Sequence, residues 1–188
     1  MSPQGPPQPP LSDGVVTLRP PRKDDVPAIV AACADPAITH FLDAVPQPYS
    51  DADGLAYVEL TEQGWRDATA AQFAMTARAD ELLGSIGVGF VEPARGLARV
   101  GYWTAPAARG RGLTTRALVL ISRWAIRDAG VERLELEADV ENIASQRVAE
   151  RAGFTREGVM RSARPNARLG RRVDSVLFSL FPADLASK

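Results

Sequence analysis

The 188-residue sequence predicts a single domain of mixed α/β (α+β) class, in which helices flank a mixed β-sheet. Residues 113–129 repeat apolar side chains at the spacing of one helix face. Residues 134–140 alternate apolar and acidic side chains, which is typical of a half-buried strand. Hydrophobic residues make up 45% of the chain, which is enough for one full core.

The first half of the chain is expected to supply the front of this sheet and two helices. Apolar side chains at helical or alternating spacing are separated there by residues that end each element. In order, we expect a strand at Val15–Arg19, a helix at Lys23–Ala34 that Asp35-Pro36 ends, a helix at Ala52–Trp65, and strands at Phe73–Ala77 and Leu83–Phe90 joined by a turn at Ala79-Asp80.

The most informative stretch consists of a strand, a glycine-rich turn and a long helix. The strand Arg99–Thr104 is expected to end before Pro106, because proline lacks the N–H that would continue pairing. In the turn AARGRG (107–112), two glycines leave no Cβ in the way of backbone N–H groups that point at a polyanion. The helix 113–129, which Gly130 closes, adds its first-turn N–H groups and dipole to this predicted phosphate site.

A second motif follows the strand 134–140. Asn142 is placed to cap a helix that begins at Ile143, and Ser145 lies in the first turn of that helix. Other phosphate-binding turns do not fit this chain, because it has no GxxxxGK[ST] and the RGRG spacing is not that of GxGxxG.

Four motifs succeed one another along the chain. They are GYW at 101–103, ARGRGLTTRAL at 108–118, ENIASQRVAERAGF at 141–154 and GRRVDSVLFSL at 170–180. In this order they resemble the GCN5-related N-acetyltransferase (GNAT) superfamily, in the branch of the RimJ/RimL ribosomal-protein N-terminal acetyltransferases. The resemblance extends from Val15 to Leu180, so we expect one GNAT domain at 14–183 after a disordered, proline-rich lead at 1–13.

The resemblance implies a GNAT fold, with the mixed sheet splayed at its middle strands, and acetyl-CoA as the acetyl donor. The pyrophosphate of CoA then lies on the glycine turn, and the pantetheine arm pairs like a strand with the backbone near Tyr102. The family usually opens this turn with Gln or Arg where this chain has Ala107, but the phosphate contacts are mostly with backbone. The expected cofactor-binding residues are Trp103, Thr104, Arg109, Gly110, Arg111, Gly112, Leu113, Thr114, Asn142 and Ser145.

Several of these residues have a second interpretation. Arg109 and Arg111 are either guanidinium clamps for phosphate or solvated surface arginines. Trp103 belongs either to the acceptor wall or to the core. The resemblance gives Ser145 the role of general acid for the departing thiolate and Asn142 a hydrogen bond to pantetheine. Both residues also suit the start of any helix.

A general base is missing where the resemblance predicts one. An amine must be neutral to attack a thioester, so a group or a water has to take its proton. The family branch has a glutamate at the position of Arg164, and arginine cannot act as a base. A water relay, or an amine that is already neutral, removes the need for a base. The remaining candidates are Glu92, Glu137, Asp139, Glu141, Glu157 and Asp174, with the only histidine, His40, as a further one.

The sequence therefore predicts an acetyl-CoA-dependent N-acetyltransferase that moves the acetyl group directly to a primary amine. The alternative that Arg164 favours is a non-catalytic acyl-CoA sensor of the same fold. The acceptor is either a protein N-terminus or a small molecule such as an amino acid, polyamine or antibiotic. The wall expected at 40–50, which includes Tyr49, does not decide between them. Related enzymes are often dimers, so a homodimer is expected by analogy.

The composition of the chain limits its possible binding partners and its cellular compartment. The 22 basic and 23 acidic residues give no sign of nucleic-acid binding, although residues 161–172 hold five arginines and no acid. We interpret that segment as a solvated hairpin, or as a surface that favours an acidic substrate or an RNA-rich setting such as the ribosome. Cys33 is the only cysteine, which fits a reducing cytoplasm, and one cysteine far from one histidine supplies no metal site. Neither a membrane span nor a signal peptide is expected.

Overall fold

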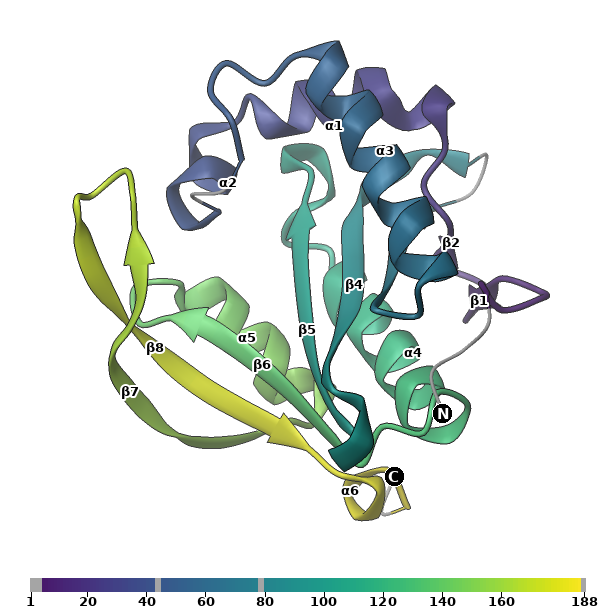
Figure 1. Ribbon diagram of the computed structural model, residues 1–188, viewed down its shortest axis with the longest axis vertical. Coiled ribbons are helices and arrows are strands. Elements are labelled where there is room, and N and C mark those ends of the chain that lie inside the picture. Colours follow the sequence, from purple (N-terminus) through teal and green to yellow (C-terminus); the bar gives the residue numbers. More distant parts are fainter. Residues whose placement is uncertain (1–4, 43–44, 78–79, 187–188) are drawn as a thin grey trace.

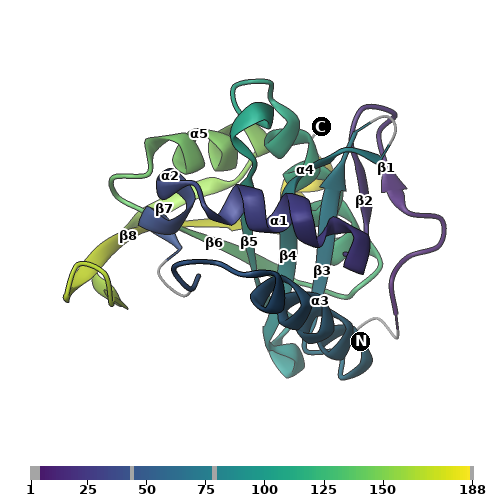
Figure 2. The same cartoon turned by 90° about the horizontal axis from the view of Figure 1, so that it is seen from above.

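The computed structural model describes residues 5–42, 45–77 and 80–186, and it consists of one sheet with helices on both faces (Figures 1 and 2). The sheet has eight strands in the order β1-β2-β3-β4-β5-β6-β8-β7. The strands are β1 (Leu11–Ser12), β2 (Thr17–Arg19), β3 (Ala70–Thr76), β4 (Leu82–Glu92), β5 (Leu97–Thr104), β6 (Arg133–Asp139), β7 (Thr155–Asn166) and β8 (Arg171–Leu180). The α-helices are α1 (Val26–Cys33), α2 (Pro36–Phe41), α3 (Asp51–Arg66), α4 (Leu113–Arg127), α5 (Ile143–Ala152) and α6 (Pro182–Ala186).

This architecture confirms the predicted mixed α/β class. The strands pair antiparallel except for β5 and β6, which are parallel. Helices α4 and α5 cover one face of the sheet, and α1 and α3 lie on the other (Figure 2). No helix in the described ranges is long and apolar enough to cross a membrane.

Helix α2 is the main element that the sequence prediction missed. Asp35-Pro36 was expected to end a helix, and it does follow α1, but the same dipeptide starts α2. The Asp35 side chain accepts a hydrogen bond from the Ala37 N–H at 2.8 Å, and Pro36 takes the first helical position, which needs no N–H donor.

Two other predicted boundaries differ for local reasons. The strand expected from Val15 begins at Thr17, because the Asp13 carboxylate accepts hydrogen bonds from Val15 N at 2.9 Å and Val16 N at 2.8 Å and holds a turn. The expected lead includes Leu11–Ser12, which pair with β2. In the turn predicted at Ala79-Asp80, Ala79 lies outside the described residues.

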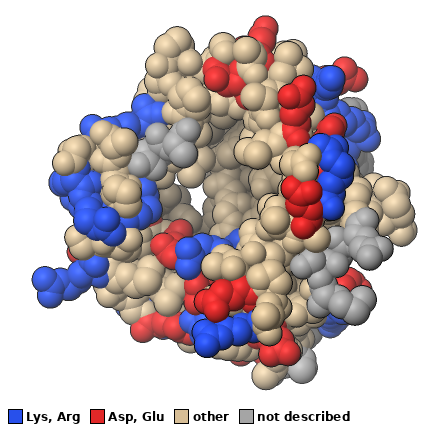
Figure 3. Space-filling view, viewed as in Figure 1, with Lys and Arg blue, Asp and Glu red and all other residues tan. Residues whose placement is uncertain are grey.

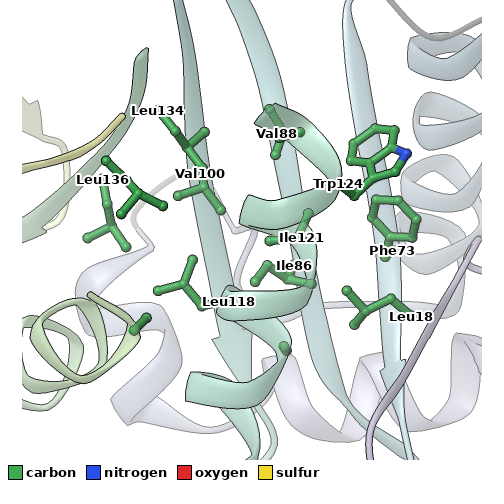
Figure 4. Close-up of a cluster of buried hydrophobic side chains, with 14 of the residues drawn as sticks. Leu18, Phe73, Ile86, Val88, Val100, Leu118, Ile121, Trp124, Leu134 and Leu136 are labelled. Carbon is green, nitrogen blue, oxygen red and sulfur yellow. The ribbon is translucent and has the colours of Figure 1, made fainter. Parts of the chain in front are cut away.

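The core lies between α4 and the sheet (Figure 4). The predicted stripe of α4 buries Ala117, Ile121 and Trp124 in the core against the sheet, and the first two are fully buried. The Trp124 ring packs edge-on against Phe73 of β3, with the ring centroids 5.5 Å apart. Burial of each large apolar side chain stabilises the fold by about 1.5–3 kcal/mol. The packing therefore fixes α4 on the sheet, with its N-terminus close to the carboxyl end of β5.

The sheet opens between β5 and β6. Their register starts at Leu97↔Arg133 and ends two residues later, at Arg99↔Glu135. Strand β5 then continues to Thr104, while β6 turns away and pairs with β8. The sheet is therefore splayed at its middle strands, as predicted, and Figure 1 shows the widening gap.

Candidate active site

Two hollows adjoin the splayed end of β5. The turn-side hollow, of about 370 Å³, lies between α2, the turn at 107–112 and α5. The sheet-side hollow, of about 560 Å³, lies over β4 and β5 beside α1, α3 and Arg164 of β7. Figure 3 shows a recess in the middle of the face on which the sheet-side hollow lies. The residues that line both hollows are Phe41, Leu42, Tyr102 and Trp103.

The turn-side hollow brings together seven of the ten residues predicted to bind the cofactor. Of the other three, Arg111 is exposed, Gly112 is the cap residue before α4, and Leu113 is buried in the core. The seven that line the hollow are Trp103, Thr104, Arg109, Gly110, Thr114, Asn142 and Ser145.

The turn has the backbone that the two glycines were expected to allow. Gly110 and Gly112 both have a φ of 72°, and a Cβ added at either one would meet no atom within 4 Å. Because this left-handed conformation disfavours other residues, glycine is required here by the backbone and not by packing. Helix α4 begins at Leu113, so its first N–H groups, which lack partners within the helix, face the turn.

The side chain of Arg109 spans the mouth of the turn-side hollow. Its guanidinium lies 2.7 Å from Asp35 of the α2 cap, and its Nε donates to the Thr104 carbonyl at 3.3 Å. The hydrogen bond from Ala37 N, followed by the contact with Arg109, lowers the pKa of Asp35 below its ordinary value. Arg109 is therefore not a purely solvated arginine, and its partner in this structure is the carboxylate of Asp35.

Asn142 and Ser145 form the start of α5 as predicted. The Asn142 Oδ1 accepts the Ser145 N–H at 3.0 Å, which caps the helix. The Ser145 Oγ lies 2.9 Å from the hydroxyl of Tyr102, which also donates to the Ser145 carbonyl at 3.2 Å. Burial raises the pKa of Tyr102 to about 12, so its hydroxyl keeps its proton at neutral pH.

The sheet-side hollow has a floor of small residues. Gly87 of β4 is paired with Gly101 of β5, and Gly89 is paired with Arg99 one row further from the splay. A Cβ added at Gly89 or Gly101 would meet no atom within 4 Å, so these two glycines leave open space above the sheet. Trp103 is half-buried at the splayed end of this floor, which corrects its interpretation as core.

The strand β6 is half-buried, as its alternation predicted, except that Glu135 on its acidic face is only 9% exposed. Glu135 pairs with Arg99 at 3.1 Å and with Arg133 of its own strand at 2.9 Å. Arg99 also contacts Glu137 at 3.0 Å. Asp139 lies 3.5 Å from Arg164, which also donates to the Phe41 carbonyl at 3.3 Å. These arginines compensate the charge of the acids.

None of the seven candidate bases lines the sheet-side hollow as the structure describes it. Three of them, with His40, lie instead around a separate hollow of about 120 Å³ between α2 and the β7–β8 hairpin; the three are Asp139, Glu141 and Asp174. His40 Nε2 lies 4.0 Å from Glu141 there. Outside these hollows, Glu92 pairs with Arg95 and Glu157 pairs with Arg133.

Tyr49, a predicted wall residue, and Cys33, which was not predicted there, both reach the sheet-side hollow. Tyr49 lines it and donates its hydroxyl hydrogen to the Asp53 carbonyl at 3.3 Å. Cys33 lines it as a free, buried thiol, whose pKa burial raises to about 11. Residues 43 and 44 of the expected wall lie outside the described residues. Among the described residues, no cluster of His, Cys, Asp and Glu side chains is suited to a metal ion.

A polar group at the side of the sheet-side hollow was not predicted from the sequence. Ser85 Oγ lies 2.7 Å from the Tyr57 hydroxyl and 2.9 Å from Gln72 Nε2. The alternation of β4, in which Ser85, Gly87 and Gly89 share one face, was a signal of small residues on that face. Tyr57 comes from α3, and only the tertiary fold brings it to Ser85.

Two features together characterise the class of protein: a mixed sheet that is splayed after β5, and a glycine turn beside the splay that is suited to binding phosphate. A family model described as "Acetyltransferase (GNAT) domain" matches residues 16–155. The chain therefore belongs to the GNAT acetyltransferase family, which confirms the resemblance seen in its motifs.

Individual relatives agree with this family. The chain is 22% identical to "Uncharacterized N-acetyltransferase p20" of Bacillus licheniformis, over 91% of this chain and 95% of that protein. It is 31% identical to "Ribosomal-protein-serine acetyltransferase" of Escherichia coli, over 50% of this chain and 52% of that protein. Among solved structures, "Mycobacterium smegmatis RimJ in complex with CoA-disulfide" superposes with a TM-score of 0.82 at 24% identity, covering 94% of this chain and 87% of that one.

Proposed function

We propose that this chain transfers an acetyl group from acetyl-CoA directly to a primary amine in a ternary complex. The main support is that the turn-side and sheet-side hollows meet at Tyr102 and Trp103, where the sheet is splayed. Acetyl-CoA would occupy the turn-side hollow, and the amine would approach from the sheet-side hollow. The CoA-disulfide bound to the RimJ relative supports CoA as the ligand.

In this scheme the pyrophosphate of CoA lies on the N–H groups of the turn and the first turn of α4. Arg109 and Arg111 contribute charge, and Arg109 would exchange its partner Asp35 for a phosphate oxygen. The Oδ1 of Asn142 is engaged as a helix cap, so a hydrogen bond to the pantetheine amide would come from its Nδ2.

Chemistry then takes place at the junction of the hollows. The amine attacks the thioester carbonyl, and a backbone N–H near Trp103 and Thr104 stabilises the oxyanion. Ser145 turns its hydrogen from the Tyr102 oxygen to the thiolate that leaves and protonates it, and water returns a proton to Ser145. The amine gives its proton to water, since the described lining of the sheet-side hollow includes neither a carboxylate nor a histidine.

The acceptor is a protein N-terminus or a small-molecule amine. The similarity to the ribosomal-protein-serine acetyltransferase of Escherichia coli and to RimJ supports the former. We further infer a cytoplasmic setting, because the single Cys33 is free.

Calorimetry with acetyl-CoA, followed by thiol release against a panel of amines and N-terminal peptides, tests the proposal. The buried Cys33 thiol, with its raised pKa, will not contribute to a thiol assay at pH 8. Binding together with release on one amine class supports the enzyme and names its acceptor. Binding without release across the panel would favour the non-catalytic acyl-CoA sensor, for which Arg164 at the base position was the sequence argument.

A further inference from the structure

The hydrogen bonds around Ser85 have only one consistent set of directions. Ser85 is 2% exposed, and its hydroxyl donates its single hydrogen to the Phe73 carbonyl at 2.9 Å. A serine oxygen otherwise only accepts. Its two remaining neighbours, the Tyr57 hydroxyl at 2.7 Å and Gln72 Nε2 at 2.9 Å, must therefore both donate to it.

This arrangement determines what the wall offers to the sheet-side hollow. Tyr57 donates its only hydrogen to Ser85, so its oxygen can otherwise only accept. The Gln72 side chain also hydrogen-bonds to this oxygen, which leaves one lone pair for a ligand. Burial raises the pKa of Tyr57 to about 12, which keeps that hydrogen in place. Gln72 directs Nε2 to Ser85, and its Oε1 lies over Gly87, where an added Cβ would collide with it. Tyr57 and Gln72 both line the hollow, each with a hydrogen-bond acceptor.

The register gives the distance of this wall from the reaction centre. Gln72, Gly87 and Gly101 form one row across β3, β4 and β5, and the next row toward the splay ends in Trp103. Two residues along a strand span about 7 Å, so an atom about 7 Å from an amine at Trp103 lies above the open floor at Gly101. Gln72 belongs to a strand two places away, but its Oε1 reaches over Gly87, which is one strand spacing of about 4.8 Å from Gly101 and so brings this oxygen toward that atom.

The charged residues of the sheet-side hollow favour an uncharged hydrogen-bond donor on the substrate. Of the described residues that line it, the charged ones are Arg99 and Arg164, and both are cations held by carboxylates outside the lining. A second ammonium on the substrate would meet like charge here, whereas an uncharged N–H or O–H would not.

We propose that Tyr57 and Gln72 form an acceptor-recognition subsite, which binds an uncharged N–H or O–H donor about 7 Å from the attacking nitrogen of the amine. The subsite rests on the proposed function, since that function places the amine at Trp103. The subsite favours amines that carry an amide or hydroxyl group about 7 Å from the attacking nitrogen, and it disfavours compact amines and polyamines. Ser85 is a positioning residue, which directs the two acceptors without touching the substrate.

A binding experiment tests the subsite without relying on turnover. The probe is the tripeptide amide Ser-Ala-Ala-NH2 with a free amino group, titrated by calorimetry into protein saturated with CoA. In an extended tripeptide the third residue's nitrogen lies about 7 Å from the first. N-methylation of that nitrogen should weaken binding to the wild type by about fivefold, the value of one ordinary hydrogen bond.

Variants then identify the partner of that N–H. Tyr57→Phe and Gln72→Leu should each weaken the parent tripeptide by about fivefold. If the pair receives the third N–H, the N-methyl penalty should shrink in both variants. Gln63→Leu is the control, because Gln63 is an exposed glutamine on α3 that contacts Asp67 and Arg66 outside the hollow. Thermal melting and the affinity for CoA show that each variant is folded.

The outcomes separate the subsite from the proposed function. The subsite is wrong if the N-methyl peptide binds the wild type as well as its parent does, or if no tripeptide binds at all. It is equally wrong if the two variants weaken ethylamine or spermidine as much as the tripeptide. Thiol release from acetyl-CoA is measured separately. Tripeptide binding with the predicted pattern but no release with any amine would uphold the subsite and overturn the transferase.

Discussion

At the scale of single residues, the pair Tyr102 and Ser145 concentrates the chemistry of the site. A serine hydroxyl alone is a weak acid, and here its oxygen lies 2.9 Å from a tyrosine hydroxyl that stays protonated. Tyr102 donates its one hydrogen to the Ser145 carbonyl, so the Ser145 hydroxyl donates to the Tyr102 oxygen. When Ser145 gives its hydrogen to the thiolate, Tyr102 can turn its own hydrogen to the Ser145 oxygen and stabilise it. The helix cap at Asn142 holds the serine at this place.

Replacement of Ser145 should reduce turnover and leave cofactor binding nearly intact. Loss of a positioned general acid typically costs about 10²-fold or more, so we expect Ser145→Ala to lower kcat by about that factor. The affinity for acetyl-CoA, measured by calorimetry, should change little, because the phosphate contacts lie at the turn. Thr155→Ala, on an exposed position of β7, is the control. An unchanged kcat in Ser145→Ala would refute the general-acid role.

The three tyrosines of the chain should titrate together at unusually high pH. Burial raises the pKa values of Tyr49, Tyr57 and Tyr102 to about 12 each, above the ordinary value of 10. Between these values the folded protein binds more protons than the unfolded chain does, so stability falls as pH rises from about 10 to 12. Tyrosinate absorbance in the folded protein should have its midpoint near pH 12. A midpoint near 10 without unfolding would contradict the burial of these hydroxyls.

At the scale of elements, the turn before α4 tests the phosphate site. Gly110 and Gly170 both have positive φ, 72° and 60°, and an added Cβ would meet no atom within 4 Å at either position. Alanine at each position therefore costs similar backbone strain, about 1–2 kcal/mol. Only Gly110 faces the turn-side hollow, so Gly110→Ala should weaken acetyl-CoA binding by about tenfold while Gly170→Ala does not. If the two variants bind acetyl-CoA with equal affinity in calorimetry, the turn is not part of the acetyl-CoA site.

The elements also show what a sequence can and cannot predict. Helix α4 was predictable, since its apolar stripe and its glycine start are local features of one segment. Helix α2 was not, because Asp35-Pro36 is equally suited to ending one helix and starting the next. The ion pairs of the β6 acids were not predictable for a different reason. Their partners Arg99 and Arg164 come from β5 and β7, and strand alternation carries no information on those partners.

At the scale of the whole molecule, the splay between β5 and β6 separates two binding surfaces, the turn-side hollow and the sheet-side hollow. The turn-side hollow depends on α4 and α5 and lies on one side of β5, whereas the sheet-side hollow depends on α1, α3 and the β7–β8 hairpin. Exposed arginines occur along that hairpin; they are Arg161, Arg168, Arg171 and Arg172. Figure 3 shows a group of basic side chains to the left of the recess. The hairpin predicted there is confirmed.

If the two hollows bind different substrates, one can be blocked without the other. Gly101 lies on the floor of the sheet-side hollow with open space above it, so Gly101→Leu would project a side chain to where the acceptor lies. We expect the KM of the amine to rise by at least about tenfold, with the affinity for acetyl-CoA unchanged. Gly158→Leu on β7, where an added Cβ also meets no atom within 4 Å, is the matched control. Loss of acetyl-CoA binding in a folded Gly101→Leu protein would mean that one ligand spans both hollows, and the ternary complex would then need a different geometry.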